Sequence, residues 1–149
     1  MVCQIAKAVG CKVIGSAGKA EKIQWLKEKA GVDGVINYKT TDDLAKALGK
    51  LAPDRIDVYF DNVGSDHLEA AIDHMKDFGC IVFCGMISTY NTTEPTTAPR
   101  NLFKVIGKRL SMQGFIVRDH MADREEFVRD VLTLIRDGKT LGRIRSQKD

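Results

Sequence analysis

The chain has 149 residues, of which 44% are hydrophobic and 29% are charged, and its formal net charge is +3. This composition fits one globular domain with a buried core and argues against a disordered chain. The small net charge gives no reason to expect a nucleic-acid partner. No apolar run approaches the roughly 18 residues that span a bilayer, and no secretory leader is recognisable, so we expect a cytoplasmic protein without a membrane partner.

Strand-like and helix-like patterns alternate along the whole chain. The strand-like runs cover residues 11–17, 34–38, 56–60, 80–85 and 110–117. Their nearly continuous apolarity is typical of strands in a parallel sheet that is covered on both faces. Between them, apolar residues recur at helical spacing, as at Leu68, Ile72 and Met75. The alternation predicts an α/β fold, a doubly wound Rossmann-type parallel sheet with helices on both faces.

Local signals predict where several helices begin and end. Thr40 and Asp43 have the spacing of a capping box before a helix over residues 44–51, and Ser65 is a natural N-cap for the next helix. A last helix around residues 127–135 is expected to end near Gly138. Residues 86–100 read as one long irregular segment, and loops of that length are often functional.

The chain opens on a predicted helix over residues 1–9, where a doubly wound domain would begin with a strand and a glycine-rich turn. We therefore expect the first, central strand to be missing and the chain to be a fragment of a longer protein. The strands at residues 11–17 and 56–60 would then lack their shared neighbour, and unpaired strand edges favour pairing with another chain. This predicts a homodimer with exchanged segments, aggregation, or marginal folding.

The cysteines and histidines do not predict a metal site. Cys80 and Cys84 fall in one strand-like run, where four residues span about 13 Å, too far to share a zinc ion. His67 and His74 lack the spacing of a zinc-binding helix. We expect buried thiols, no metal and a reducing compartment.

Candidate binding residues follow the carboxyl ends of the strands, where ligands of open parallel sheets bind. Small residues through Gly18 precede Lys19 and Lys22 at the start of a helix, a position that favours an anion. No acidic residue directly follows this strand to hold a ribose 2′-hydroxyl, so the pattern suits the 2′-phosphate of NADP. Two solvated surface lysines are the alternative.

Two later strand ends offer further candidates. Asn62 stands in an Asn-Val-Gly turn after the strand at residues 56–60, and a small polar run leads from Cys84 to Tyr90 after the next strand. Glycine in such a run lets a ligand approach the backbone closely. An ordinary turn and an irregular polar loop are the alternatives for these two segments.

Four motifs in order carry a resemblance to a known family: VIGSAGKAEKIQWLKEKAGVDGVINYK, FDNVGS, CGMISTYN and GKRLSMQGFIV. Together they resemble the zinc-independent medium-chain dehydrogenases/reductases, in particular the prostaglandin reductases, leukotriene dehydrogenases, plant alkenal double-bond reductases and bacterial curcumin reductases. The resemblance covers residues 2–140. It implies that residues 1–149 form an NADP-binding, Rossmann-type domain and that the family's GroES-like substrate domain is absent from this chain.

The resemblance also implies roles for individual residues. Lys22 would contact the 2′-phosphate, Tyr38 would lie beside the adenosine end of NADP, and Asn62 would line the cofactor cleft. Tyr90 is the implied catalytic residue, since it would support the nicotinamide ribose hydroxyl. The remaining cofactor-binding residues are Gly18, the run of Cys84, Gly85, Met86, Ile87, Ser88, Thr89 and Tyr90 along the nicotinamide, and the backbone of Phe115, Ile116 and Val117 at the carboxamide.

The activity implied by the resemblance is NADPH-dependent reduction of the carbon–carbon double bond of an α,β-unsaturated ketone or aldehyde. The full-length protein would catalyse it, and we expect the isolated chain to be inactive. Two alternatives stand beside it: a non-catalytic nucleotide-binding module derived from such a reductase, and an S-adenosylmethionine-dependent methyltransferase, which residues 56–63 also resemble. A methyltransferase would need an acid at the end of the strand at residues 11–17, where Ser16, Ala17 and Gly18 stand. The sequence does not identify the enone or enal.

Overall fold

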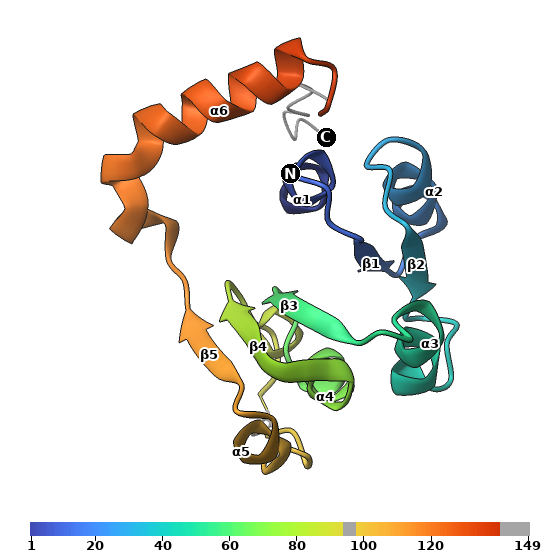
Figure 1. Cartoon of the computed structure of the whole chain (residues 1–149). Coiled ribbons are helices and arrows are strands. Elements are labelled where there is room, and N and C mark those ends of the chain that lie inside the picture. Colours follow the sequence, from blue (N-terminus) through green and yellow to red (C-terminus); the bar gives the residue numbers. More distant parts are fainter. Residues whose placement is uncertain (94–97, 141–149) are drawn as a thin grey trace. The chain divides into compact units, whose positions relative to one another are not determined.

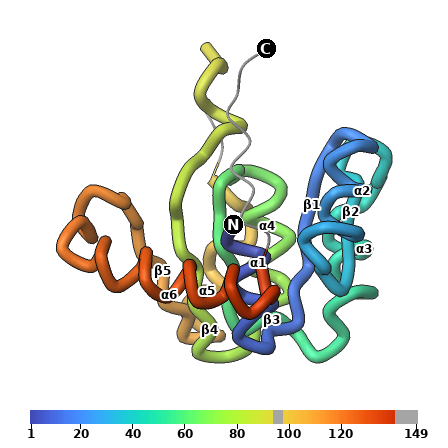
Figure 2. Tube along the Cα trace, turned by 90° about the horizontal axis from the view of Figure 1, so that it is seen from above, coloured from blue at the N-terminus to red at the C-terminus, as the bar shows by residue number. Residues whose placement is uncertain are grey.

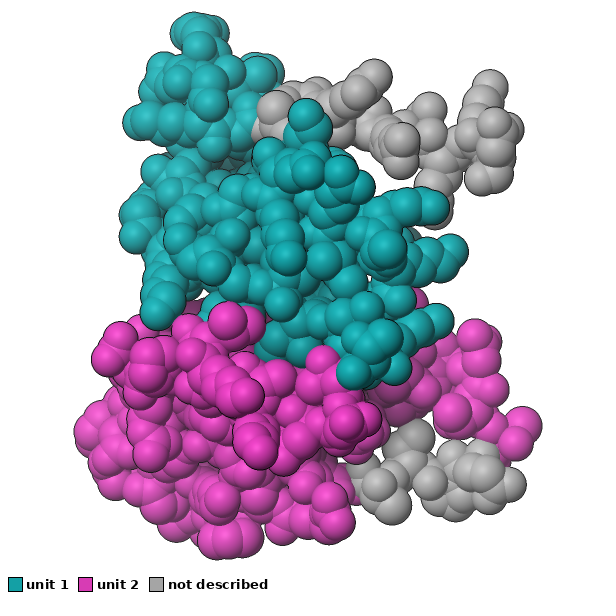
Figure 3. Space-filling view, turned by 90° about the vertical axis from the view of Figure 1, so that its right-hand side faces the viewer, with its two compact units in different colours: residues 1–40, 118–149 teal, residues 41–117 magenta. Residues whose placement is uncertain are grey.

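The computed structural model describes residues 1–93 and 98–140 of the chain. The chain divides into two compact units, residues 1–40 with 118–149 and residues 41–117, which Figure 3 distinguishes by colour. Each unit holds one parallel sheet with flanking helices, the Rossmann-like arrangement that the alternating sequence pattern predicts. Within the described residues, every helix is too short or too polar to traverse a bilayer.

The first unit is built on two parallel strands. Its elements are α1 (Val2–Ala8), β1 (Ile14–Ala17), α2 (Ala20–Glu28), β2 (Gly34–Asn37) and α6 (Arg124–Arg136), with a 3₁₀ segment at Val117–Asp123 before α6. β1 and β2 pair in register from Ile14 opposite Gly34 to Ala17 opposite Asn37. Helix α2 packs against both strands (Figure 2), and Ala30, just beyond that helix, is buried.

An ion pair connects α1 to the start of the strands. Lys7 Nζ lies 2.8 Å from one carboxylate oxygen of Asp33, and the Val13 backbone N–H donates to the other oxygen at 2.6 Å. These bonds, the one from Lys7 first, hold the pKa of Asp33 below its usual range. A lowered pKa in the folded state stabilises the fold at neutral pH, and this contribution is lost as the pH falls through that pKa.

The second unit contains the larger sheet, with strand order β3-β4-β5 and all strands parallel. Its elements are α3 (Leu44–Leu51), β3 (Ile56–Asp61), α4 (Ser65–His74), β4 (Met75–Phe83), the 3₁₀ segment Ile87–Thr89, α5 (Lys104–Lys108) and β5 (Ser111–Gly114). Because all three strands run in the same direction, their carboxyl ends meet at one edge of the sheet (Figure 1).

The core of the second unit lies between this sheet and α4. Tyr59, Ile81 and Met112 are partners across the three strands, so their side chains share one face. On that face the buried side chains Leu68, Ile72, Met75 and Ile81 form a cluster, against which Tyr59, Met112 and Val105 of α5 pack. The helical spacing of residues 68, 72 and 75 thus predicts the buried face correctly.

A lysine joins α5 to the end of α4. The Lys108 ammonium donates to the backbone carbonyl oxygens of Ile72, Asp73 and Met75 at 2.8–2.9 Å. A helix leaves its last carbonyl groups without partners inside the helix, and a cation is favoured at that end. Lys108 therefore adds a cation at the end of α4, where the Met75 backbone N–H and the His74 ring already bond to the carbonyl groups of Ala71 and Ala70.

Several cap and boundary predictions fail: β1 begins at Ile14 rather than at residue 11, β5 ends at Gly114 rather than at residue 117, and three further positions differ. Asp43 is itself the N-cap of α3 and accepts a hydrogen bond from the Lys46 N–H at 2.8 Å, so Thr40 begins no capping box. Gly64 rather than Ser65 is the N-cap of α4, because its φ of 75° and ψ of −157° suit glycine. β4 begins at Met75 instead of residue 80, since Met75 already pairs with Ile56 across a register shift.

Replacing Ile81 by alanine should lower the free energy of unfolding by about 3 kcal/mol, because the fully buried side chain leaves a cavity in the core cluster. The matched control is Ile106→Ala on α5, where the side chain is 81% exposed and the change should cost less than about 0.5 kcal/mol. Urea denaturation followed by circular dichroism measures both. Equal losses in the two variants would contradict the assigned core.

Candidate functional site

The connection between β1 and α2 presents an open helix N-terminus. β1 ends at Ala17 and α2 begins at Ala20, with Lys19 at the N-cap position. A lysine side chain has no hydrogen-bond acceptor, so Lys19 does not cap the first N–H groups of the helix. Lys22, exposed in the first turn, adds a positive charge near these donors. Glu21 stands in the same turn and offsets part of this charge. The backbone N–H groups and Lys22 are the groups available to an anion, whose binding here stays a prediction.

Tyr38 lies against the backbone of Gly18. A Cβ atom on Gly18 would be 2.7 Å from both Cζ and Oη of Tyr38, and 3.0 Å from Cε of Lys39. Ala17 and Asn37 are partners across the two strands, so the residues that follow them are also neighbours. The structure thus brings Gly18 and Tyr38 together at the carboxyl edge of the first sheet. It adds Lys39, which the sequence analysis missed although it directly follows Tyr38.

In the second unit, the turn at residues 61–64 and the loop at residues 84–90 form one hydrogen-bonded structure, which we call the strand-end platform. The backbone N–H groups of the loop donate to the carbonyl oxygens of residues 61–63 at 2.8–3.2 Å: Cys84 and Gly85 to Asp61, Ile87 to Asn62, and Ser88 to Val63. The Ser88 hydroxyl donates to the Val63 carbonyl as well. The predicted residues Asn62 and Cys84 to Tyr90 are therefore held side by side.

Tyr90 folds back over its own loop. Its hydroxyl accepts a hydrogen bond from the Met86 backbone N–H at 3.3 Å, and a Cβ on Gly85 would lie 3.0 Å from the same oxygen. The side chain is 66% exposed. Because the Met86 bond uses a lone pair of the oxygen, the O–H proton can be donated to a ligand.

A buried carboxylate lies beneath the platform. Asp61, fully buried, accepts three hydrogen bonds at Oδ1, from the backbone N–H groups of Val63 and Gly64 at 2.9 Å and from the Tyr59 hydroxyl at 3.0 Å. Burial, together with the charge of Asp61, raises the pKa of Tyr59, which keeps this donor protonated. Asp61 is not among the residues predicted from the sequence, although an acid ending an otherwise apolar strand is a visible signal.

The segment after β5 continues the same edge of the sheet. The Phe115 N–H donates to the Phe83 carbonyl at 2.8 Å, and its ring centroid lies 6.4 Å from that of Phe60. Ile116 and Val117 are exposed beyond it. Cys84, expected to be buried, is exposed because β4 ends one residue earlier. Asn62, Cys84 to Tyr90 and Phe115 to Val117 thus all follow carboxyl ends of this sheet.

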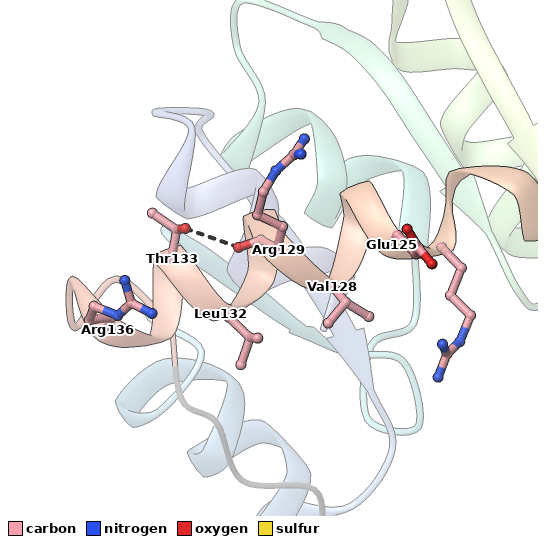
Figure 4. A pocket seen from close by; sticks show the side chains of 7 residues that line it. Glu125, Val128, Arg129, Leu132, Thr133 and Arg136 are labelled. Atoms are coloured by element: carbon pink, nitrogen blue, oxygen red, sulfur yellow. Dashed lines mark hydrogen bonds between the residues drawn. The ribbon is translucent and has the colours of Figure 1, made fainter.

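A hollow of about 420 Å³ lies elsewhere, along one face of α6 (Figure 4). Its lining residues are Arg124, Glu125, Val128, Arg129, Leu132, Thr133 and Arg136. All seven come from a single helix, and the Thr133 hydroxyl is bonded to the Arg129 carbonyl of the same helix at 2.9 Å. None of the predicted site residues takes part, so this surface is separate from the candidate site.

The chain matches the protein family described as zinc-binding dehydrogenase over residues 1–136. It is 45% identical to the 2-alkenal reductase (NADP(+)-dependent) of Nicotiana tabacum over 95% of this chain and 41% of that protein. It is 46% identical to prostaglandin reductase 1 of Bos taurus over 93% of this chain and 42% of that protein. The structure of CurA from Vibrio vulnificus in complex with NADPH superposes with a TM-score of 0.86 at 37% identity, covering 96% of this chain and 44% of that one.

Replacing Gly18 by alanine should lower the free energy of unfolding by no more than about 0.5 kcal/mol, because the new Cβ meets only the far ends of the exposed Tyr38 and Lys39 side chains, which can move aside. Gly107→Ala on α5 is the control: no heavy atom of the described residues comes within 4 Å of that Cβ, and alanine should leave stability unchanged or raise it by about 0.5 kcal/mol. Urea unfolding of both variants measures the two changes. A loss well above about 1 kcal/mol in the Gly18 variant would show that the Tyr38 ring cannot move off this turn.

Proposed function

Because the chain belongs to the zinc-binding dehydrogenase family, we propose that it is the NADP-binding part of a reductase that acts on the carbon–carbon double bond of α,β-unsaturated ketones or aldehydes. The chain spans about two-fifths of the length of the relatives described above, 41% and 42%. The names of these relatives, a 2-alkenal reductase and a prostaglandin reductase, support the substrate class. They also remove the basis for the methyltransferase interpretation.

The observation that carries the cofactor assignment is the open end of α2, with Lys22 in its first turn and Tyr38 against Gly18. Backbone N–H groups, a helix dipole and a lysine are what a 2′-phosphate needs. Strand β1 ends in small residues, and a carboxylate there would repel that phosphate. These features fit NADP better than NAD. We assign the adenosine end of the cofactor to Gly18, Lys22 and Tyr38.

The nicotinamide end is assigned to the second unit. The strand-end platform offers Asn62 and the loop from Cys84 to Tyr90, and the backbone of residues 115–117 offers groups for the carboxamide. When bound, NADPH would supply the hydride that adds to the β-carbon of the substrate. Tyr90 would donate a hydrogen bond to a hydroxyl of the nicotinamide ribose and so orient it. The ribose hydroxyl that Tyr90 orients would in turn donate to the substrate carbonyl oxygen. A donor at that oxygen stabilises the negative charge that develops there.

Further parts of the proposal concern the whole protein. A GroES-like domain outside this chain forms most of the substrate pocket. The protein acts in the cytoplasm, and its reaction needs no zinc ion. The isolated chain binds cofactor without turnover. The edge of β3 that does not pair with β4 has no partner strand among the described residues, and such an open edge favours a homodimer.

A fluorescence titration of the chain with NADPH and with NADH tests the cofactor assignment. NADPH should bind at least about tenfold more tightly, and Lys22→Ala should remove about 1.4 kcal/mol of that preference while leaving NADH affinity unchanged. Lys27→Ala, in the last turn of the same helix, is the matched control and should behave as the unmodified chain. Equal affinities for the two nucleotides would refute the assignment of the 2′-phosphate.

Replacing Tyr90 by phenylalanine in the full-length protein should lower kcat on the order of tenfold, less than the loss of a direct oxyanion donor, because the hydroxyl acts through the ribose. The KM for NADPH should change little, since the ring and the loop remain. Steady-state kinetics with a 2-alkenal as substrate measure both constants. An unchanged kcat would remove the catalytic role of Tyr90.

A further inference from the structure

The strand-end platform depends on a group that is itself fully buried, the carboxylate of Asp61. Its Oδ1 accepts from the N–H groups of Val63 and Gly64, which closes the turn around Asn62. Asn62 lies between the acceptor and its two donors and is exposed. The Asp61 side chain thus fixes the backbone that follows Asn62, while the Asp61 main chain directly precedes Asn62.

The same residue reaches the loop that carries Tyr90. The Asp61 carbonyl oxygen accepts from the N–H groups of Cys84 and Gly85 at 2.8 and 3.1 Å. Gly64, fixed by the carboxylate at a φ of 75°, faces the loop so closely that a Cβ there would lie 3.0 Å from Cε of Met86. The turn and the loop therefore share one support, and a change in the turn is passed on to the loop.

Tyr59 also holds the carboxylate of Asp61 in place. Its hydroxyl donates to the same Oδ1 at 3.0 Å, and its ring packs against the core cluster of the second unit. Oδ2 is buried and, among the described residues, no donor reaches it. All three bonds thus converge on Oδ1, the oxygen that an asparagine in the same orientation would also present to these donors.

We infer that Asp61 is the positioning residue for the nicotinamide half of the cofactor site. It acts through Asn62 and through the loop bearing Tyr90, and it touches no ligand itself. This inference rests on the proposed function. Because Asp61 organises only segments of the second unit, its loss should weaken binding of the nicotinamide half and spare the adenosine half, which is assigned to the first unit.

The test compares two probes by isothermal titration calorimetry: NADPH, which carries both halves, and 2′,5′-ADP, which carries only the adenosine half with its 2′-phosphate. Asp61→Ala should weaken NADPH binding by about tenfold or more, the equivalent of one lost hydrogen bond to a charged group, and leave 2′,5′-ADP binding unchanged. Asp61→Asn keeps the acceptor for both N–H groups and should restore NADPH affinity to within about threefold. Asp57→Ala is the matched control, a carboxylate on the same strand that is 74% exposed and paired with Lys76.

Gly64→Ala gives an independent route to the same turn should Asp61→Ala fail to fold. It leaves the carboxylate in place, strains the positive φ and presses on Met86, so it should show the same selective loss of NADPH affinity. Equal weakening of both probes in these variants would reveal a general structural role and overturn the inference. Unchanged NADPH affinity in Asp61→Ala, or an asparagine variant as weak as the alanine variant, would also overturn it.

The unmodified chain separates this inference from the function on which it rests. The proposed function requires the chain to bind NADPH, whereas the role of Asp61 also requires NADPH to bind more tightly than 2′,5′-ADP. An unmodified chain that binds neither probe would refute the proposed function and the role of Asp61 together. A chain that binds 2′,5′-ADP and NADPH with equal affinity would refute only the role of Asp61, since the platform would then contribute nothing.

Discussion

The hydrogen bonds to the buried carboxylate of Asp61 are the interaction on which the second unit's candidate site depends. Burying a carboxylate is costly unless donors replace the water that it loses. At Oδ1 two backbone N–H groups and the Tyr59 hydroxyl do so, all from residues within three positions of Asp61, whereas Oδ2 has no donor among the described residues. The strand therefore ends in a turn of defined shape, and the neighbouring loop is built on the carbonyl groups of that turn.

A glycine beside a tyrosine hydroxyl recurs in both units. In the first unit Gly18 leaves room for the Tyr38 ring, and in the second Gly85 leaves room for the Tyr90 hydroxyl. In each case the glycine follows the carboxyl end of a parallel strand. An aromatic side chain held over bare backbone provides a rigid surface with one polar atom, and such a surface orients a ligand at little cost in side-chain entropy.

The chemistry of the two units is different. The first presents backbone N–H groups and the cationic side chain of Lys22 at a helix end, which suits a phosphate. The second presents Asn62, the Tyr90 hydroxyl and main-chain groups, which suit ribose hydroxyls and an amide. This division is the reason that the proposed function assigns the two halves of a dinucleotide to sequence motifs far apart in the chain. It also explains why each half of the cofactor can be tested with a separate probe.

Periodicity and residue type by themselves determined the fold class, the five strands, the buried face of α4 and the strand ends where ligands bind. They could do so because burial imposes a repeat on apolar residues and because parallel strands place their carboxyl ends at one edge. The exact caps were not predictable in this way. Asp43, Gly64 and Met75 take their roles from backbone angles and strand register, which depend on neighbouring elements.

Only the tertiary structure decided which groups support the site. Asp61 is visible in the sequence as an acid that ends an apolar strand, but only the structure shows that its carboxylate is buried and that the neighbouring loop bonds to its carbonyl oxygen. Lys39 reaches Gly18 only because the two strands pair. Lys108 is a surface lysine by sequence, yet it adds a cation at the end of a helix more than thirty residues away. Long-range hydrogen bonds of this kind have no periodic signature, because they depend on which elements fold against one another. The residues proposed to line the site could therefore be named from the chain, whereas the contacts that hold them in place required the tertiary structure.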